Sequence, residues 1–184
     1  MTTELSHPSG RTDIQEAPSA LPSLAFGRAT EAVAVQQYAI LHPSWTITEC
    51  VLFIHPDLPF LAASPDRTVS NPGTGEEGLL EVKCPSSVQV APTVTAEQKA
   101  SFCFQKVDGR VRLKKTHQHY WQVQGQIACC GMQWCDFCVY SEGELFAERV
   151  QFDREAWQRG FSLLKKFYLN HYGPKLLSVS WLCH

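Results

Sequence analysis

Hydrophobic and polar residues alternate along three segments in the first half of the chain, residues 46–55, 60–69 and 78–84. Alternation with a period of two predicts β-strands, because successive side chains of a strand point to opposite faces of the sheet. The turn sequence His55-Pro56-Asp57-Leu58-Pro59 separates the first two segments, so we expect these strands to be joined there. The three segments together predict one β-sheet.

The remaining periodic segments predict helices and a second pair of strands. Residues 29–41 have the periodicity of an amphipathic helix. In the helix predicted for residues 117–131, Trp121, Gln124 and Ala128 form one stripe, and Gln122 lies off it. We further expect a helix at 95–105, strands at 134–141 and 144–152 paired across Glu142-Gly143, and a final helix capped by Asp153 and running to residue 171. This order of elements predicts an α/β fold.

Length and composition predict one domain. At 184 residues and 44% hydrophobic content, the chain can bury a substantial core without a second domain. Residues 1–23 are rich in Ser, Thr and Pro, a composition that predicts a disordered tail. The sequence shows neither a signal segment nor a run of about twenty hydrophobic residues, so we expect an intracellular protein, of the cytoplasm or nucleus, without membrane contact.

The net charge of −2 excludes the global basic field of many non-specific DNA-binding proteins. A local basic segment surrounds the Asp108-Gly109 turn, and we expect it to contact nucleic acid only if a phosphodiesterase site lies beside it. The alternative is a solvated hairpin without a ligand. The basic segment consists of Lys106, Arg110, Arg112, Lys114 and Lys115.

Two acids and a lysine carry the candidate chemistry. Glu81 and Lys83 are two positions apart on a predicted strand and therefore point to the same face, while Val82 points into the core. If Asp66 ends the neighbouring strand, two carboxylates meet, and a divalent cation is the usual compensation for such repulsion. Oxygen ligands favour Mg²⁺, with Mn²⁺ as a substitute. The alternative is an ordinary charged pair on a solvated strand face.

Such a centre suits phosphodiester hydrolysis. The acids Asp66 and Glu81 would hold the cation that activates water and neutralises the phosphate oxygens. Lys83 would orient the water, help deprotonate it, or neutralise charge in the transition state.

Several segments in sequence order resemble the PD-(D/E)XK nuclease superfamily and, within it, the YqaJ viral recombinase family typified by lambda-type phage exonuclease. The resemblance covers residues 24–172. The segments that carry it are Phe26-Gly27-Arg28-Ala29-Thr30-Glu31, Ala63-Ser64-Pro65-Asp66, Gly78-Leu79-Leu80-Glu81-Val82-Lys83-Cys84-Pro85, Tyr120-Trp121-Gln122-Val123-Gln124-Gly125-Gln126 and Gly131-Met132-Gln133-Trp134-Cys135-Asp136-Phe137 with the strand of Tyr140.

The resemblance implies a restriction-endonuclease-like core, with a mixed central sheet flanked by helices over residues 24–172 and a C-terminal tail at 173–184. It implies that Glu31 reaches the metal directly or through water, that the backbone carbonyl of Val82 is a further ligand, and that Gln122 belongs to the catalytic cluster. It also implies a Mg²⁺-dependent exonuclease that resects duplex DNA ends for recombination and repair. Its partners would be a single-strand annealing protein and, in a ring-shaped oligomer, further copies of itself.

Two departures from the family pattern favour other functions. Arg67 stands where the family has Gly, and we expect it to contact a DNA phosphate; the alternative is that it crowds the site. The sequence contains no counterpart of the Arg-containing N-terminal segment that binds a DNA end. One alternative is therefore a catalytically inactive nuclease fold that binds DNA. A structure-specific endonuclease with the same centre is the other.

The cysteines and histidines favour structural positions over a metal site. Of the eight cysteines, Cys135 and Cys138 form a C-x-x-C, but a strand sends positions three apart to opposite faces. We expect reduced thiols or core residues. His117 and His119 flank a helix start, and we expect both to face solvent; the alternative is contact with metal or phosphate.

Overall fold

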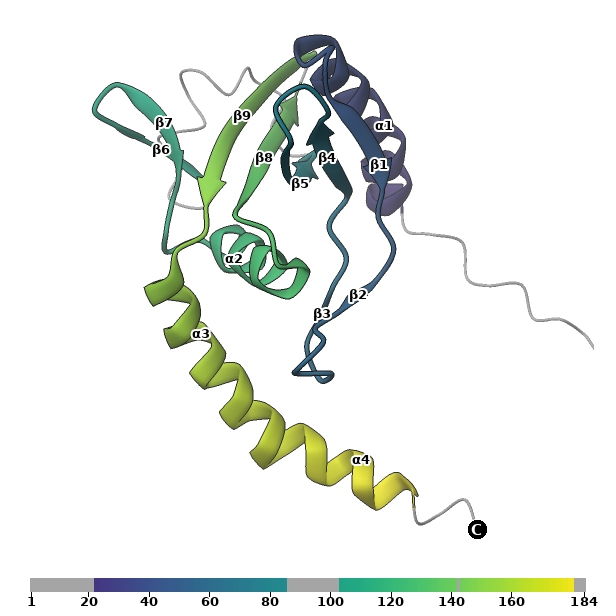
Figure 1. The fold of residues 1–184 in the computed structure, drawn as a ribbon, viewed down its shortest axis with the longest axis vertical. Coiled ribbons are helices and arrows are strands. Elements are labelled where there is room, and N and C mark those ends of the chain that lie inside the picture. The colour runs from purple at the N-terminus through teal and green to yellow at the C-terminus, as the bar shows by residue number, and fades with distance from the viewer. Residues whose placement is uncertain (1–21, 86–102, 142, 181–184) are drawn as a thin grey trace, which may run out of the picture.

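The computed structural model describes residues 22–85, 103–141 and 143–180, which form a five-stranded mixed sheet with helices on both faces (Figure 1). The strand order is β1-β4-β5-β8-β9; β5 and β8 are parallel, and the other neighbours are antiparallel. The strands are β1 (Thr46–Glu49), β4 (Arg67–Asn71), β5 (Glu76–Lys83), β8 (Trp134–Ser141) and β9 (Glu144–Gln151). The predicted α/β core with a mixed central sheet is confirmed.

Each face of the sheet has its own hydrophobic core. Helix α1 (Pro22–Leu41) buries Ala34 and Tyr38 against Leu80 and Val82 of β5. Helix α2 (Gln118–Cys130) packs Val123 and Ile127 in the other core, with Leu79 of β5. The strand alternation therefore directs Glu81 and Lys83, which share a face with Leu79, toward α2.

The remaining elements surround this core. Short strands β2 (Phe53–Ile54) and β3 (Ala62–Ala63) pair with each other, as do β6 (Phe104–Val107) and β7 (Arg110–Leu113). Figure 1 shows a long C-terminal helix that leads away from the sheet. It consists of α3 (Arg154–Phe167), the π turn η1 (Tyr168–Tyr172) and α4 (Gly173–Ser180).

Three predicted elements differ in extent. Each of the long strands predicted at 46–55 and 60–69 is two short ones. In the second, Pro65 lies between β3 and β4, and a proline cannot donate to a strand ladder. The helix predicted at 95–105 lies largely outside the described residues, but its last two positions belong to β6. The final helix continues beyond 171, because Pro174 stands in the first turn of α4, where a missing N–H is tolerated.

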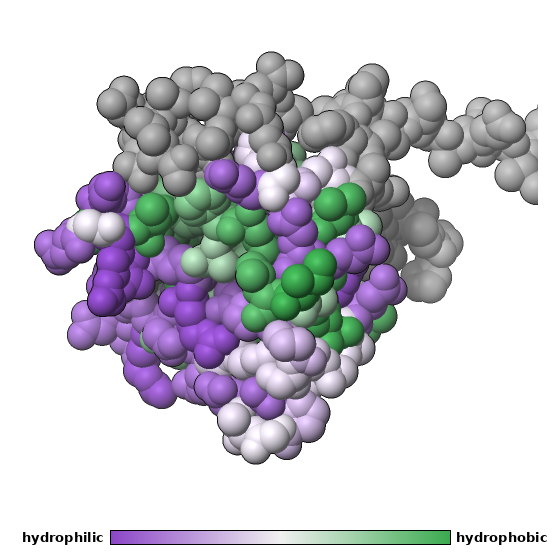
Figure 2. Space-filling model, turned by 90° about the horizontal axis from the view of Figure 1, so that it is seen from above, coloured by the Kyte–Doolittle hydropathy of each residue, from purple (hydrophilic) through white to green (hydrophobic). Residues whose placement is uncertain are grey.

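The outer surface is mixed. Figure 2 shows hydrophobic side chains gathered in a patch among hydrophilic ones on the face seen from above. Near the end of α1, Ile40 and Leu41 are 76% and 62% exposed and line a hollow with Leu145 and Phe146 of β9. No helix among the described residues is both long enough and apolar enough to cross a membrane.

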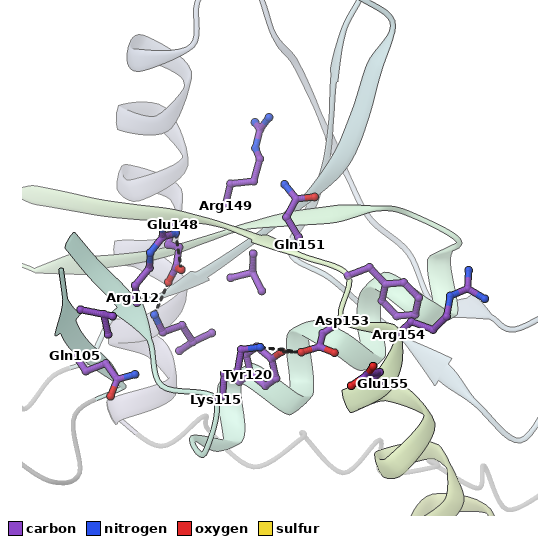
Figure 3. A pocket seen from close by; sticks show the side chains of 14 residues that line it. Gln105, Arg112, Lys115, Tyr120, Glu148, Arg149, Gln151, Asp153, Arg154 and Glu155 are labelled. Carbon is purple, nitrogen blue, oxygen red and sulfur yellow. Dashed lines mark hydrogen bonds and ion pairs between the residues drawn. The ribbon is translucent and has the colours of Figure 1, made fainter. Parts of the chain in front are cut away.

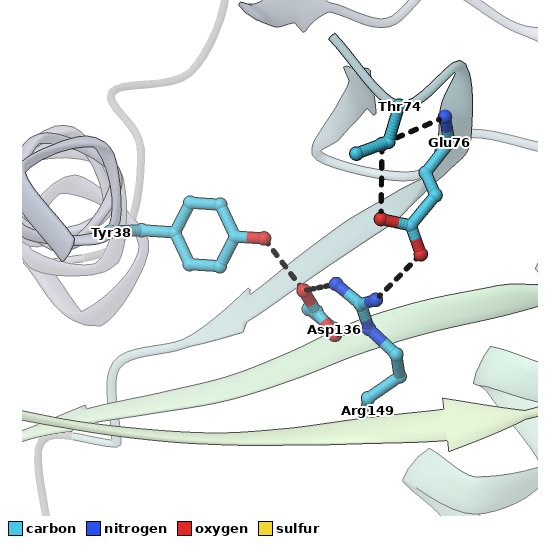
Figure 4. Close-up of polar contacts among 5 residues, drawn as sticks. All are labelled: Tyr38, Thr74, Glu76, Asp136 and Arg149. Carbon is cyan, nitrogen blue, oxygen red and sulfur yellow. Dashed lines mark hydrogen bonds and ion pairs between the residues drawn. The ribbon is translucent and has the colours of Figure 1, made fainter. Parts of the chain in front are cut away.

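A buried polar network fastens α1 to the sheet (Figure 4). Asp136 of β8 is 5% exposed and accepts hydrogen bonds from the Tyr38 hydroxyl at 2.6 Å and from Arg149 Nε and Nη2 at 2.9 and 3.0 Å. Arg149 also reaches Glu76 at 3.7 Å and lies 3.6 Å from the centre of the Trp134 ring. The two donor residues thus come from different elements, Tyr38 from α1 and Arg149 from β9.

We expect Asp136→Ala to lower the free energy of unfolding by about 3 kcal/mol, because it leaves the Tyr38 hydroxyl and the Arg149 guanidinium without their acceptor. Urea denaturation followed by circular dichroism measures the change. Asp57→Ala, at an exposed position, is the matched control and should alter stability by less than about 0.5 kcal/mol. Equal stability of the two variants would contradict the network's role.

Candidate active site

Pairing of β4 with β5 places Asp66 beside Glu81. Strand β4 begins at Arg67, whose partner in the antiparallel ladder is Leu80, so Asp66 stands at the start of β4 next to Glu81 and Val82. The Val82 N–H donates to Asp66 Oδ2 at 2.7 Å. This hydrogen bond fixes the Asp66 carboxylate at the edge of the strand that carries Glu81 and Lys83.

Glu81 is a buried carboxylate held by donors from two elements. Its side chain is 2% exposed. Lys83 Nζ and Gln122 Nε2 contact Oε1 at 2.5 and 2.6 Å, and Gln126 Nε2 contacts Oε2 at 2.8 Å. A carboxylate is tolerated at this depth when it is paired and hydrogen-bonded. The structure therefore brings Glu81, Lys83 and Gln122 together, as the sequence predicted, and adds Gln126.

The acids repel one another. The pKa of Asp66 is raised from 3.8 to about 6, chiefly by burial and then by the negative charge of Glu81, with a smaller contribution from Glu31. The Val82 N–H and the Lys83 ammonium oppose this rise. The site thus concentrates negative charge at a partly buried point.

Arg67 compensates part of that charge. Its Nη1 lies 3.2 Å from Glu31 Oε1 and donates to the Asp66 carbonyl at 2.5 Å, while Nη2 lies 3.9 Å from the exposed Glu49. Glu31 is therefore near the other acids but held by an ion pair. The arginine that departs from the family pattern stands inside the acidic cluster.

The residue types suit a hard divalent cation. Within residues 22–85, 103–141 and 143–180, no group of three or more His, Cys, Asp or Glu side chains is arranged to hold a metal ion. Two carboxylates do converge, and a cation between them would relieve their repulsion, which raises the pKa of Asp66 after burial, the larger cause. Glu81 Oε1 accepts two hydrogen bonds, whereas Oε2 accepts one and keeps a lone pair with which it could bind a cation.

Without metal, we expect Asp66 to make wild-type stability fall as pH rises through about 6, relative to Asp66→Asn. A carboxyl whose pKa is raised by folding binds its proton more tightly in the native state, so its contribution is present below about pH 4 and lost above about pH 6. Thermal unfolding in EDTA from pH 4 to 8 measures it. Asp66→Asn is the reference variant because the asparagine side chain has no titratable group but still offers an acceptor to the Val82 N–H. A constant difference in melting temperature across this range would contradict the raised pKa of Asp66.

Sequence reasoning missed two neighbours of the site. Gln126 lies four residues after Gln122 on α2, a spacing that places both on one helix face and was a usable signal. His119 is half-buried, with its ring 5.6 Å from that of Phe137, so the prediction that it faces solvent is wrong. Burial and then the charge of Lys83 lower the pKa of His119 to about 4, and His119 is therefore neutral at pH 7.

The predicted basic segment forms the β6–β7 hairpin and the turn after it, and several of its charges have acidic partners. Arg112 lies 3.2 Å from Glu148, and Lys115 lies 2.9 Å from Asp153. Both basic residues line a cavity of about 780 Å³ between the hairpin, β9 and the start of α3 (Figure 3). Lys106 and Arg110 are exposed on the hairpin, whereas Lys114 is partly buried.

The C-x-x-C cysteines lie in different cores, as strand alternation predicted. Cys135 packs with α2 residues, and Cys138 packs with α1 residues. Both are free thiols.

Comparisons with known proteins agree with this fold. Residues 3–133 match the family model described as the YqaJ-like viral recombinase domain. The crystal structure of LHK-Exo in complex with dAMP is 26% identical over 88% of this chain and 78% of that chain, with a TM-score of 0.59. That of an alkaline exonuclease (LHK-Exo) from Laribacter hongkongensis is 25% identical over 86% and 77%, with a TM-score of 0.56. The search of curated proteins gave no match.

The resemblance recognised in the sequence motifs is thereby confirmed, and the family match begins at residue 3, upstream of those motifs. Similarity to an alkaline exonuclease agrees with the mixed sheet and its flanking helices. Because the family match extends over more than half of the residues, this chain belongs to the YqaJ-like viral recombinase domain family.

Proposed function

We propose that this protein is a Mg²⁺-dependent deoxyribonuclease that resects duplex DNA ends. The observation that carries the proposal is the buried Glu81, bonded to Lys83 and Gln122 and standing beside Asp66, whose pKa it raises. Membership of the YqaJ-like family and similarity to an alkaline exonuclease support this function. End resection places the protein in DNA recombination and repair.

Asp66, Glu81 and the Val82 carbonyl would hold Mg²⁺, with Glu31 as a ligand directly or through water. When bound, the cation supplies a Lewis acid for the phosphate oxygens and a water of lowered pKa. Mn²⁺ offers the same preference for oxygen ligands. Glu31 can join this set because its carboxylate already lies close enough to Asp66 to raise its pKa.

The other residues of the site position groups and neutralise charge. Lys83 carries the ammonium that orients the attacking water and stabilises the charge of the transition state. Gln122 and Gln126 clamp the two oxygens of Glu81, so the carboxylate keeps one orientation. Arg67 balances Glu31 and Asp66 or contacts a DNA phosphate. Neutral His119 borders Lys83 without adding a second positive charge.

The DNA contact would come from the β6–β7 hairpin. Lys106 and Arg110 are its exposed cations, and Arg112, Lys114 and Lys115 continue the segment toward the site. We propose double-stranded DNA with an end as substrate, a single-strand annealing protein as partner and a homo-oligomer as the working form.

Release of nucleotides from end-labelled linear duplex DNA tests the function. We expect release with Mg²⁺ and none with EDTA. Covalently closed circles of the same sequence should stay intact, since an end-directed exonuclease requires an end; cut circles would instead identify a structure-specific endonuclease. Retained DNA binding without release from any substrate would contradict nuclease activity.

The Arg67–Glu31 ion pair favours a second candidate, a nuclease fold that binds DNA without cutting it. The pair occupies Glu31, the acid that the resemblance implies for the metal site. In this case the protein would shift DNA in a gel equally with Mg²⁺ and with EDTA, and Arg67→Gly would leave the absence of cutting unchanged.

A further inference from the structure

A cavity of about 320 Å³ lies beside the acidic cluster, between β3, α2 and α3. Its volume lies at the small end of the range of ligand sites, which suits a planar group the size of a nucleobase. Residues from three separate elements line it. Those that matter below are Ser64, Trp121, Gln122, Gln126 and Trp157.

The cavity shares a wall with the candidate active site. Gln122 and Gln126 line it, and the same two side chains donate to the oxygens of Glu81. Ser64 is on the opposite wall, two residues before Asp66. A strand of DNA whose phosphate reaches Glu81 therefore has a nucleotide within reach of this cavity.

Two indoles give the cavity flat, hydrophobic walls. Trp121 of α2 is 40% exposed, and a Cβ added to Gly160 of α3 would lie 3.2 Å from its ring. Likewise, a Cβ added to Gly125 of α2 would lie 3.7 Å from the ring of Trp157 of α3. The glycines let each ring rest against the opposite helix. Stacking on aromatic rings is how proteins bind unpaired bases without regard to sequence.

Gln126 adds a buried acceptor. Its side chain is 4% exposed, and Oε1 has no hydrogen-bond partner among the described residues. If the amide were turned over, its oxygen would face the negatively charged Glu81 carboxylate. The hydrogen bond from Nε2 to Glu81 therefore leaves Oε1 as the atom without a partner. A buried acceptor without a donor is costly, and the edge of a nucleobase offers N–H donors.

We infer that this cavity binds an unpaired nucleobase of the DNA strand held at the active site, stacked on Trp121. This inference rests on the proposed function, because it takes DNA as the substrate. A base site of this kind would make the active site prefer a frayed or single-stranded DNA end, because the bases are unpaired there. Because Gln126 both lines the cavity and holds Glu81, a base in the cavity would be coupled to the position of the carboxylate.

A double-mutant cycle on binding tests the inference. The ligands are two fluorescent DNA forks with three unpaired nucleotides on each strand; one fork has its bases and the other is abasic at the unpaired positions. Anisotropy in EDTA gives Kd without hydrolysis. Removal of the bases should weaken wild-type binding about tenfold, and Trp121→Leu should weaken binding of the intact fork to a similar extent. In Trp121→Leu the abasic fork should bind no more weakly than the intact one.

Controls separate stacking from folding. Trp121→Phe keeps an aromatic ring and should retain the dependence on bases, so the test stands even where Trp121→Leu fails to fold. Phe167→Leu removes an exposed aromatic side chain of α3 outside the cavity and should match the wild type.

Three outcomes would overturn the inference: equal wild-type affinity for the two forks, additive losses in the cycle, or no binding of either fork. A wild type that binds with base dependence but never cuts DNA would refute the proposed nuclease and leave the base site standing. A wild type that cuts DNA but binds the two forks equally would refute the base site and leave the proposed nuclease standing.

Discussion

Replacement of Lys83 by alanine should slow nucleotide release by on the order of 100-fold or more, while DNA binding stays within about twofold of the wild type. The ammonium of Lys83 lies 2.5 Å from Glu81 Oε1 at the edge of the buried site, where it can reach a water or phosphate oxygen. A group that acts mainly in the transition state affects the rate more than affinity. Single-turnover release from end-labelled duplex DNA measures the rate, and anisotropy in EDTA measures binding.

The matched control is Lys165→Ala, which removes an exposed lysine of α3 far along the chain from the acids. It should leave rate and affinity unchanged. The loss of Lys83 also removes one of the two donors to Glu81 Oε1, so a thermal melt of each variant shows whether both are folded. If folded Lys83→Ala released nucleotides at the wild-type rate, Lys83 would have no role in the reaction.

Glu81→Gln should reduce nuclease activity by on the order of 1,000-fold or more and abolish saturable Mg²⁺ binding. A buried carboxylate that holds a Lewis acid contributes several kcal/mol to the barrier, and each 1.4 kcal/mol is about tenfold in rate. Asp66→Asn should act in the same direction. Isothermal titration of Mg²⁺ with the folded protein gives a measure that does not depend on activity.

Glu77→Gln is the control for Glu81→Gln, because Glu77 belongs to the same strand β5 but is exposed. It should bind Mg²⁺ and cut DNA as the wild type does. Unchanged Mg²⁺ affinity in Glu81→Gln would show that the cation, if the protein uses one, is held elsewhere.

Local patterns in the sequence determined the strand that carries the site. Because side chains alternate in a strand, Glu81 and Lys83 had to share a face, and in the structure Lys83 Nζ lies 2.5 Å from Glu81 Oε1. The limits of α2 also followed from local chemistry, since His117 caps its start and Gly131 ends it at a positive φ of 69°. The two C-x-x-C cysteines separated into opposite cores for the same reason of alternation.

Helical periodicity alone did not show which face of α2 is buried. The predicted stripe of Trp121, Gln124 and Ala128 included the half-exposed Trp121, whereas the core takes Val123 and Ile127. Gln124 is fully buried because its amide donates to the Gln151 carbonyl at 2.9 Å and accepts from the Asp153 N–H at 2.7 Å. A polar side chain that satisfies backbone groups at a strand end is indistinguishable, in a sequence, from one that faces solvent.

The sequence by itself thus identified the two acids and the lysine as candidates, the common strand face of Glu81 and Lys83, and the family that these residues indicate. Only the tertiary structure decided that Gln126 shares Glu81 with Gln122, that His119 turns inward, and that Arg67 pairs with Glu31. Arg67 and Glu31 are separated by 36 residues, and Glu81 and Gln126 by 45. Periodicity encodes which way a side chain points from its own element, whereas the partner it meets depends on how distant elements pack together.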